Sequence, residues 1–216
     1  MHKWNALILA LVMAFAIGCG DDDDNDNPDD NSQALIYVNL SPNSSWDYQV
    51  NTGGLMADGH VEVVAIDSEY VTGVDAYKVE YRQNNLLVAT RWFQVTSAGM
   101  FLLGEEVQEQ TQVITRTFLT PVEMIRHPLE KENGILVQSF STNSELEEGG
   151  SETHRFDVQG KEAAPTPDGP YEAIHMLHTR SGEGSPTEQY DEYFVPGTGY
   201  VQFELPEGFT WSLSEE

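Results

Sequence analysis

The stretch 73–96, GVDAYKVEYRQNNLLVATRWFQVT, carries the clearest structural signal in the chain. Apolar and charged side chains alternate along its first half, with Tyr77, Val79 and Tyr81 on one face and Lys78, Glu80 and Arg82 on the other. Because successive side chains of a β-strand point to opposite faces, this alternation indicates a strand with one buried and one wet face. Asn84-Asn85 separates it from a second run rich in β-branched and aromatic residues. We predict a β-hairpin with its turn at this Asn pair.

Short runs of the same kind continue along the chain, separated by Gly, Asn, Asp and Pro. Besides the hairpin strands 73–82 and 86–96, the candidate strands are 46–51, 60–67, 106–118, 135–141, 153–160, 171–180, 188–195, 199–205 and 209–213. No long stretch has the 3.6-residue period of an amphipathic helix. About eleven short strands at this spacing are typical of a single antiparallel curved sheet, a half-barrel or a barrel. We therefore predict one all-β domain over residues 34–216.

Two stretches interrupt this pattern. Residues 120–133, TPVEMIRHPLEKEN, place helix-forming residues between two prolines, which favours one helical turn or an ordered loop. The fold prediction therefore includes at most one short helix near 121–132. Residues 141–151, STNSELEEGGS, are predicted to form an exposed hairpin tip.

The first residues read MHKWNALILALVMAFAIGC. The apolar run from Ala6 to Ile17 is shorter than the roughly 20 residues that a helix needs to span a bilayer, and it is typical of a secretory signal. The run ends in Ala16-Ile17-Gly18-Cys19, which resembles the lipobox of bacterial lipoproteins. This resemblance implies cleavage of the signal peptide 1–18 and acylation of Cys19, whose acyl chains would anchor the protein in a membrane. An ordinary signal peptide that contains a cysteine is the alternative.

The residues after Cys19 predict a spacer. Residues 20–33, GDDDDNDNPDDNSQ, contain seven Asp and no apolar side chain, so they cannot form a core, and we predict a disordered acidic tether over 19–33. The alternate carboxylates of Asp22, Asp24 and Asp26 suggest a calcium loop as the alternative, but Asn27 and Gln33 stand where such a loop needs Gly and Glu. Gly20 in place of Asp favours the outer over the inner membrane of the cell envelope, by resemblance to enterobacterial lipoproteins.

The balance of charged residues limits the classes of molecule that the protein can bind. The chain has 36 Asp and Glu against 10 Lys and Arg, for a net charge of −26. This balance argues against a nucleic-acid partner, because phosphate backbones are bound by Lys and Arg. One Cys in the whole chain excludes an intramolecular disulfide and a zinc site built from cysteines.

The body also contains a series of short segments with Gly, Pro and aromatic residues. Trp46-Asp47-Tyr48 is followed by Pro128-Leu129, by PDGPYEAIHM at 167–176 and by YFVPGTGYVQF at 193–203. This order resembles a family of secreted β-rich bacterial proteins with P-x-G-x-[FY] and F-x-P-G-x-G-x-V segments. The resemblance implies a β-rich fold and assigns no catalytic residue. Ile135-Leu136 departs from it, since the family usually has an aromatic residue after the Gly of its Pro-Leu segment.

The sequence contains no strong pattern for a catalytic site or a metal-binding site. His175 and His178 would share a face on a helix, but on the predicted strand 171–180 they point to opposite faces and cannot share a metal ion. His60, His127 and His154 are isolated in sequence, which leaves a spatial cluster open. No Gly-x-Ser-x-Gly nucleophile elbow is present. Acidic pairs could form a glycosidase site, and the candidates are Glu105-Glu106, Glu130/Glu132, Glu145/Glu147/Glu148 and Asp191-Glu192. We predict no metal and no cofactor.

The aromatic residues support a binding function. The inward row of a closed or half-closed barrel can line a cavity that takes an apolar ligand. We therefore predict a non-enzymatic, membrane-anchored envelope lipoprotein that binds a hydrophobic or lipid-like ligand through Trp92, Tyr193 and Phe203, with Phe93 and Phe194 as substitutes if the strand register differs by one residue. A structural or protein-interaction lipoprotein without a small-molecule site is the alternative. An envelope hydrolase is the third.

Overall fold

The computed structural model describes residues 40–71, 73–109, 111–127, 131–132, 135–136, 138–183, 185–205 and 208–214. The predicted signal peptide, the lipidation site Cys19, the acidic tether and its calcium-loop alternative all lie outside these residues, and so does Pro128-Leu129. Within the described part, no helix is long and apolar enough to cross a membrane.

The described residues form strands and no helix, so the predicted all-β class is confirmed. The strands are β1 (Ser45–Asn51), β2 (Met56–Val71), β3 (Val74–Gln83), β4 (Leu86–Thr96), β5 (Gly99–Glu109), β6 (Gln112–Arg126), β7 (Lys131–Glu132), β8 (Ile135–Leu136), β9 (Gln138–Glu145), β10 (Ser151–Ala164), β11 (Tyr171–Gly182), β12 (Glu188–Val195), β13 (Gly199–Leu205) and β14 (Phe209–Leu213). β7 and β8 pair only with each other, and the other twelve form one antiparallel sheet.

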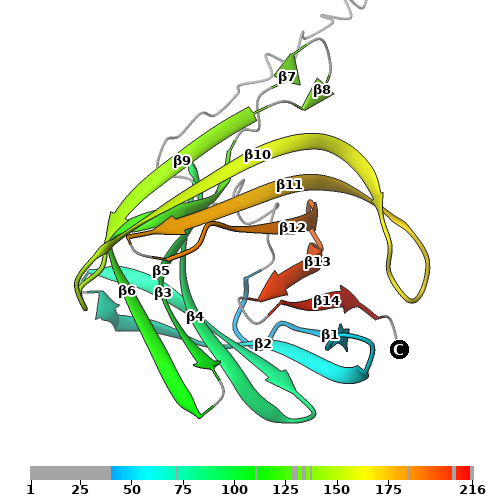
Figure 1. Cartoon of the computed structure of the whole chain (residues 1–216), viewed down its shortest axis with the longest axis horizontal. Helices are drawn as coiled ribbons and strands as arrows, with labels where there is room; N and C mark the ends of the chain where they lie inside the picture. Colours follow the sequence, from blue (N-terminus) through cyan, green and yellow to red (C-terminus); the bar gives the residue numbers. More distant parts are fainter. Residues whose placement is uncertain are drawn as a thin grey trace, which may run out of the picture.

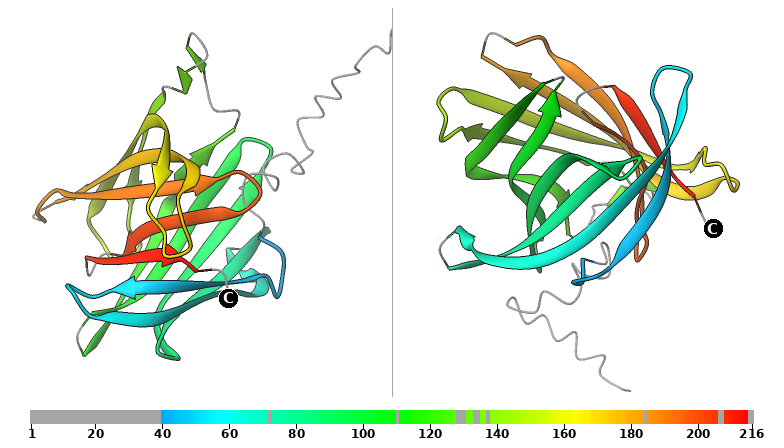
Figure 2. Two further views of the ribbon diagram at one scale, coloured as in Figure 1. Left: turned by 90° about the vertical axis from the view of Figure 1, so that its right-hand side faces the viewer. Right: turned by 90° about the horizontal axis from the view of Figure 1, so that it is seen from below.

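The sheet wraps into a nearly closed barrel around a common interior (Figures 1 and 2). Its strand order is β6-β5-β4-β3-β2-β1-β14-β13-β12-β11-β10-β9, so the first and last strands of the chain pair with each other in the middle of the sheet. In that pair Tyr48 lies opposite Leu213 and Val50 opposite Trp211. Bulges interrupt several ladders, for example between Trp92 and Phe93, and such bulges bend a sheet into a barrel.

The two outer strands, β6 and β9, meet at a seam. One backbone bridge joins Phe118 to Leu146. Side chains add further bonds across the seam: the Ser144 hydroxyl donates to the Thr120 carbonyl at 2.6 Å, and the Glu123 amide donates to the Thr142 hydroxyl at 3.2 Å. The seam therefore brings the outer strands together without a continuous ladder.

The inward-facing residues of the strands form the hydrophobic core. On β13, Val201, Phe203 and Leu205 are buried while Gln202 and Glu204 between them are partly exposed, as the alternation predicts. Trp211 of β14 is fully buried and stacks on Phe203 with ring centres 5.7 Å apart. Gly59 lies under these rings, because a Cβ at this position would come within 2.7 Å of the Trp211 ring. A side chain at Gly59 would therefore displace the core.

The hairpin at Asn84-Asn85 forms as predicted. Both residues have positive φ, 48° and 66°, which a two-residue turn between twisted strands requires and which Asn tolerates. The predicted strands 86–96, 188–195, 199–205 and 209–213 match the structure residue for residue. The hairpin tip predicted at 141–151 is shorter than expected, because β9 continues to Glu145 and β10 begins at Ser151.

Two predictions in the middle of the chain are wrong. Residues 106–118 are not one strand, because the chain reverses between Glu109 and Gln112, which pair with each other at the end of the β5–β6 hairpin. The turn carries no Gly, Asn, Asp or Pro that would have marked it. Thr120–Arg126 is neither a helical turn nor a loop but continues β6. Pro121 is tolerated there because β6 is an outer strand, where a missing N–H breaks no ladder bond on the open side.

The barrel is complete within the predicted body. All twelve strands of the sheet lie between Ser45 and Leu213, and the described core cluster lies between Leu40 and Leu213. The described core therefore lies within residues 34–216, and the boundary of the domain at residue 34 stays a prediction.

Candidate functional site in the barrel interior

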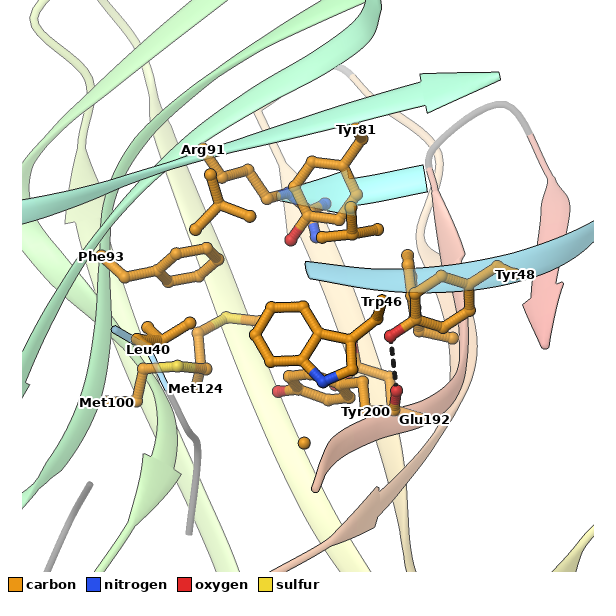
Figure 3. A pocket seen from close by; sticks show the side chains of 14 residues that line it. Leu40, Trp46, Tyr48, Tyr81, Arg91, Phe93, Met100, Met124, Glu192 and Tyr200 are labelled. Carbon is orange, nitrogen blue, oxygen red and sulfur yellow. Dashed lines mark hydrogen bonds between the residues drawn. The ribbon is translucent and has the colours of Figure 1, made fainter. Parts of the chain in front are cut away.

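A half-open pocket enters the barrel interior beside β1 (Figure 3). It contains about 570 Å³ of empty space, part of it open to solvent. Most of the lining is apolar or aromatic, and it consists of Leu40, Trp46, Tyr48, Val61, Val79, Tyr81, Arg91, Phe93, Met100, Met124, Glu192, Gly199, Tyr200 and Phe203. Two ionisable side chains with opposite charge, Arg91 and Glu192, interrupt this apolar wall.

The pocket wall is held in place by contacts between strands that are distant in sequence. The Tyr48 hydroxyl of β1 donates a hydrogen bond to the Tyr200 carbonyl of β13 at 2.7 Å, drawn as a dashed line in Figure 3. The Tyr48 ring meets Phe203 edge-to-face, with centres 5.4 Å apart. Burial raises the pKa of Tyr48 far above its usual range, so its hydroxyl stays protonated and available as a donor. The aromatic wall is therefore a preformed surface.

Behind the pocket, charged side chains fill the interior. Glu105 of β5 is 2% exposed, and three guanidinium groups approach its carboxylate: Arg91 at 3.1 Å, Arg116 at 3.3 Å and Arg180 at 3.5 Å. Burial alone would raise the pKa of Glu105, but these three cations lower it, so the carboxylate is ionised. Arg180 also holds Glu152 through two hydrogen bonds of 3.0 and 2.7 Å. The cluster thus places three arginines against two buried or partly buried carboxylates inside the barrel.

Two histidines link this cluster to the pocket. His154 Nε2 lies 3.2 Å from Glu152 Oε2, His154 Nδ1 lies 3.1 Å from His178 Nε2, and His178 Nδ1 lies 3.1 Å from Glu192 Oε1. These four residues form a continuous chain from the cluster to the pocket wall. Of the three histidines for which the sequence left a spatial cluster open, His154 lies beside His178 and His60 lies beside Asp47. His178 lies inside, whereas His175 lies on the outer face, where it stacks on Tyr193 and contacts Asp191 at 2.7 Å.

The pocket and the charged cluster are neighbours. A second, smaller space of about 340 Å³, part of it open to solvent, borders the cluster and shares Arg91, Met124 and Glu192 with the pocket. Glu192 is 5% exposed, and the buried Tyr200 hydroxyl lies beside it. Burial, and then the charge of Glu192, raises the pKa of Tyr200 well above its usual range. A side-chain hydrogen bond with Glu192 adds to this rise, so the two polar groups of the wall lie close enough to pair with each other.

The three residues predicted from sequence to bind the ligand are not brought together. Phe203 lines the pocket. Trp92 instead belongs to a separate outer cluster with Ala76 and Leu103, where it stacks on Tyr70 with ring centres 4.3 Å apart. Tyr193 lies on the outer face beside His175. The neighbours of Trp92, Arg91 and Phe93, line the pocket in its place.

The two-residue period of the strands identifies some of the residues that line the pocket. Phe93, which a one-residue register shift puts in place of Trp92, lines the pocket, while Phe194 is buried in the core outside the lining. Arg91 and Glu192 share the inward face of their strands, but alternation alone assigns charged residues to the wet face. Trp46 carries a signal only as the first residue of a candidate strand and as part of the Trp46-Asp47-Tyr48 segment, and neither places it in a pocket.

The arrangement does not favour hydrolysis. Both ring nitrogens of His154 and of His178 are already engaged in the chain, so neither imidazole offers a nitrogen to a substrate. Glu105 and Glu152 are fixed by arginines and have lowered pKa values, which does not suit a general acid at neutral pH. In the described residues no group of three or more His, Cys, Asp or Glu side chains could hold a metal ion.

The charged cluster predicts that the folded protein loses stability at acidic pH. Burial alone would raise the pKa of Glu152, but hydrogen bonds from His154 and Arg180 and the charges of Arg180 and Arg116 lower it from 4.5 to about 2. The unfolded chain then binds more protons between these values, so the Glu152 contribution is complete above pH 4.5 and lost as the pH falls toward 2. We expect it to amount to about 2–3 kcal/mol of unfolding free energy. Burial lowers the pKa of His154, which begins the loss below pH 6.5.

Urea unfolding followed by circular dichroism between pH 2 and 7 measures this loss. Glu152→Gln is expected to be less stable at pH 7 and to flatten the pH dependence between 4.5 and 2. Glu145→Gln, an exposed carboxylate on β9, serves as the matched control and should keep the wild-type slope. A Glu152→Gln profile parallel to the wild type would show that Glu152 is not held by its partners.

Comparisons with known proteins add little. No protein-family model matches the chain, and a comparison with curated proteins gives no match. Among solved structures, the chain is similar to a protein from Parabacteroides distasonis described as a "putative lipoprotein". The two share 12% identity with a TM-score of 0.45, over 82% of this chain and 95% of the other. A similarity of this size carries no inference about function, and the resemblance of the body to a family of secreted β-rich proteins stays a prediction.

Proposed function

We propose that this protein is a lipoprotein of the bacterial cell envelope, anchored through acyl chains on Cys19, whose β-barrel binds a small hydrophobic or amphiphilic ligand. The pocket between β1, β4 and β13 carries this proposal. It is half open, it is lined by aromatic and aliphatic side chains, and it ends against buried polar groups. Ligand sites commonly combine a mainly apolar wall with a few fixed polar groups.

The anchor is supported by the N-terminal sequence. Cys19 is the single cysteine of the chain, and it follows the apolar run at the position that a lipobox requires. The described residues begin at Leu40, which is itself part of the pocket wall. The 20 residues between Cys19 and Leu40 span at most about 70 Å when fully extended. The anchor therefore keeps the pocket within reach of a membrane surface, from which an apolar ligand can be drawn. Outer-membrane placement rests on Gly20.

Native mass spectrometry tests the ligand. Residues 34–216, purified from cells without denaturation and then incubated with an envelope lipid extract, are expected to carry a reproducible extra mass that organic solvent releases. Trp46→Ala should lose most of it, because this partly buried indole forms part of the wall and its removal takes away apolar contact area. Tyr193→Ala removes an aromatic ring from the outer face and should keep the bound mass.

A clean ligand-free mass in the wild type after both treatments would contradict the proposal. It would favour the protein-interaction alternative, for which the structure offers exposed apolar side chains at two hairpin tips. Leu55 and Met56 lie where the β1–β2 turn enters β2, Leu86 and Leu87 lie at the start of β4, and these four side chains are 75%, 61%, 71% and 45% exposed. Backbone and side-chain bonds between Asp58 and Asn84 hold the two hairpin tips together.

A further inference from the structure

The pocket lies toward the end of the barrel at which the chain enters the sheet. Because the strands are antiparallel, the start of β1 lies at the same end as the β4–β5, β10–β11 and β12–β13 turns. Several lining residues lie within two positions of this end or just before β1, and Figure 3 shows some of them around the Trp46 ring: Leu40, Trp46, Met100, Met124 and Gly199. We call it the mouth end, and the end with the β1–β2, β3–β4 and β5–β6 turns is the opposite end.

The segment that leads to the anchor is fixed at the mouth end. Leu40 is buried in the pocket wall. After it, the Asn43 amide donates to the Val63 carbonyl at 2.8 Å, and the Val63 amide donates to the Ser44 carbonyl at 2.9 Å. The 20 residues between Cys19 and Leu40 span at most about 70 Å, which lets either end of the barrel meet a membrane. The surfaces of the two ends therefore decide which one does.

The two ends differ in charge. Among the described turn residues and the strand residues that border them, the mouth end has one cation, Arg126, and one anion, Asp168. The corresponding residues of the opposite end include no Lys or Arg and six glutamates, namely Glu109, Glu145, Glu147, Glu148, Glu183 and Glu188. Lipid head groups carry phosphates, and cell-envelope membranes have a negative surface potential. The mouth end therefore approaches a bilayer at the lower electrostatic cost.

The surface of the mouth end also suits contact with lipid. Its turns expose Ala98 and five prolines, namely Pro42, Pro165, Pro167, Pro170 and Pro196. The partly buried indole of Trp46 lies among them at the start of β1, and tryptophan is enriched where proteins meet the membrane–water interface. The β2–β3 hairpin starts from the same end but folds onto the outer face, where Tyr70 stacks on Trp92. Its carboxylates thus lie beside the barrel.

The opposite end offers the competing surface. Leu55, Met56, Leu86 and Leu87 are exposed there and would gain from contact with lipid. The six glutamates of the same end oppose that contact, because a bilayer that reached the apolar side chains would also meet these charges.

We propose that the barrel docks on a lipid bilayer with its mouth end, so that the pocket opens onto the lipid and takes its ligand from it directly. This inference rests on the proposed ligand-binding function and names the surface from which the ligand enters. An apolar ligand that left the bilayer through water would expose its whole apolar area on the way. Docking at the mouth removes that cost.

Fluorescence quenching in phosphatidylcholine vesicles tests the docking on the full chain, isolated from the membrane fraction and reconstituted. Cys19 is the single cysteine of the chain, so once it is acylated an introduced cysteine is the one free thiol. A nitrobenzoxadiazole label is placed on Ala98→Cys or Pro196→Cys at the mouth end, or on Thr111→Cys as the matched control at the opposite end. All three are exposed turn residues. We expect lipids with a nitroxide head group to quench most of the fluorescence at 98 and 196 and to leave 111 unchanged.

The other outcomes separate the docking from the function on which it rests. Quenching at 111 that equals or exceeds quenching at both mouth positions would overturn the proposal, and so would the absence of quenching at all three. Either result leaves the pocket as a ligand site, because the bound mass in native mass spectrometry is read independently. Quenching at 98 and 196 in a protein that takes up no ligand mass would overturn the ligand site, and with it this route of entry.

Discussion

Replacing Glu105 by glutamine is expected to lower the free energy of unfolding by about 3–5 kcal/mol. Three arginines face this carboxylate in an interior where its side chain is 3% exposed. The amide is nearly isosteric, so the change removes charge without opening a cavity. It leaves Arg91, Arg116 and Arg180 with one compensating anion fewer, and a buried cation without its partner costs more than an ordinary lost hydrogen bond. Urea unfolding at pH 7 measures the difference in unfolding free energy between Glu105→Gln and the wild type.

Glu106→Gln provides the matched control. Glu106 is the next residue on β5 and is exposed on the opposite face, so the same substitution there should change stability by less than about 0.5 kcal/mol. A loss below about 1 kcal/mol for Glu105→Gln would mean that water or a rearranged Glu152 replaces the missing charge. The cluster would then be a solvated cavity rather than a dry ion network.

Most strands of this chain can be predicted from short stretches of sequence, because side-chain alternation and turn residues mark them. Alternation over 77–82 and the Asn84-Asn85 turn are readable because each strand has one wet face and each tight turn needs particular residues. The prediction fails where a turn uses residues without such a preference, as between Glu109 and Gln112. It also fails at Pro121, since the sequence does not reveal that β6 is an outer strand, where proline does no harm.

The candidate site could not be predicted in the same way. Its charged cluster joins β4, β5, β6, β10 and β11, and no spacing in the sequence reports that these strands bring Arg91, Glu105, Arg116, Glu152 and Arg180 together. Alternation also misleads here, because it assigns charged residues to the solvent face, whereas the interior of this barrel is partly polar. The sequence-based prediction assigned ligand binding to aromatic residues, but two of those it named, Trp92 and Tyr193, face outward.

Replacing Cys19 by serine is expected to move the protein completely from the membrane fraction to the soluble fraction. Acyl chains contribute about 0.8 kcal/mol per buried CH2 group, and two or three chains give stable anchoring where one gives only reversible binding. The serine hydroxyl cannot take the thioether-linked lipid, so both acylation steps are lost. Fractionation with an alkaline carbonate wash measures the transfer, and mass spectrometry of the N-terminal peptide shows the missing acyl mass. Ser32→Ala in the tether should leave both unchanged.

We expect the transfer to the soluble fraction to be complete because the charge of residues 34–216 offers no second attachment to a membrane. Seven of the 36 acidic residues lie in the tether, and nine of the ten Lys and Arg lie in residues 34–216, so the body keeps a net charge of −20. Such a charge repels anionic lipid head groups and supplies no second attachment to a membrane. If Cys19→Ser stays with the membranes after the carbonate wash, the anchor is not the acyl group. If the wild type is itself soluble, Cys19 belongs to an ordinary signal peptide, and the barrel must meet its ligand away from the membrane surface.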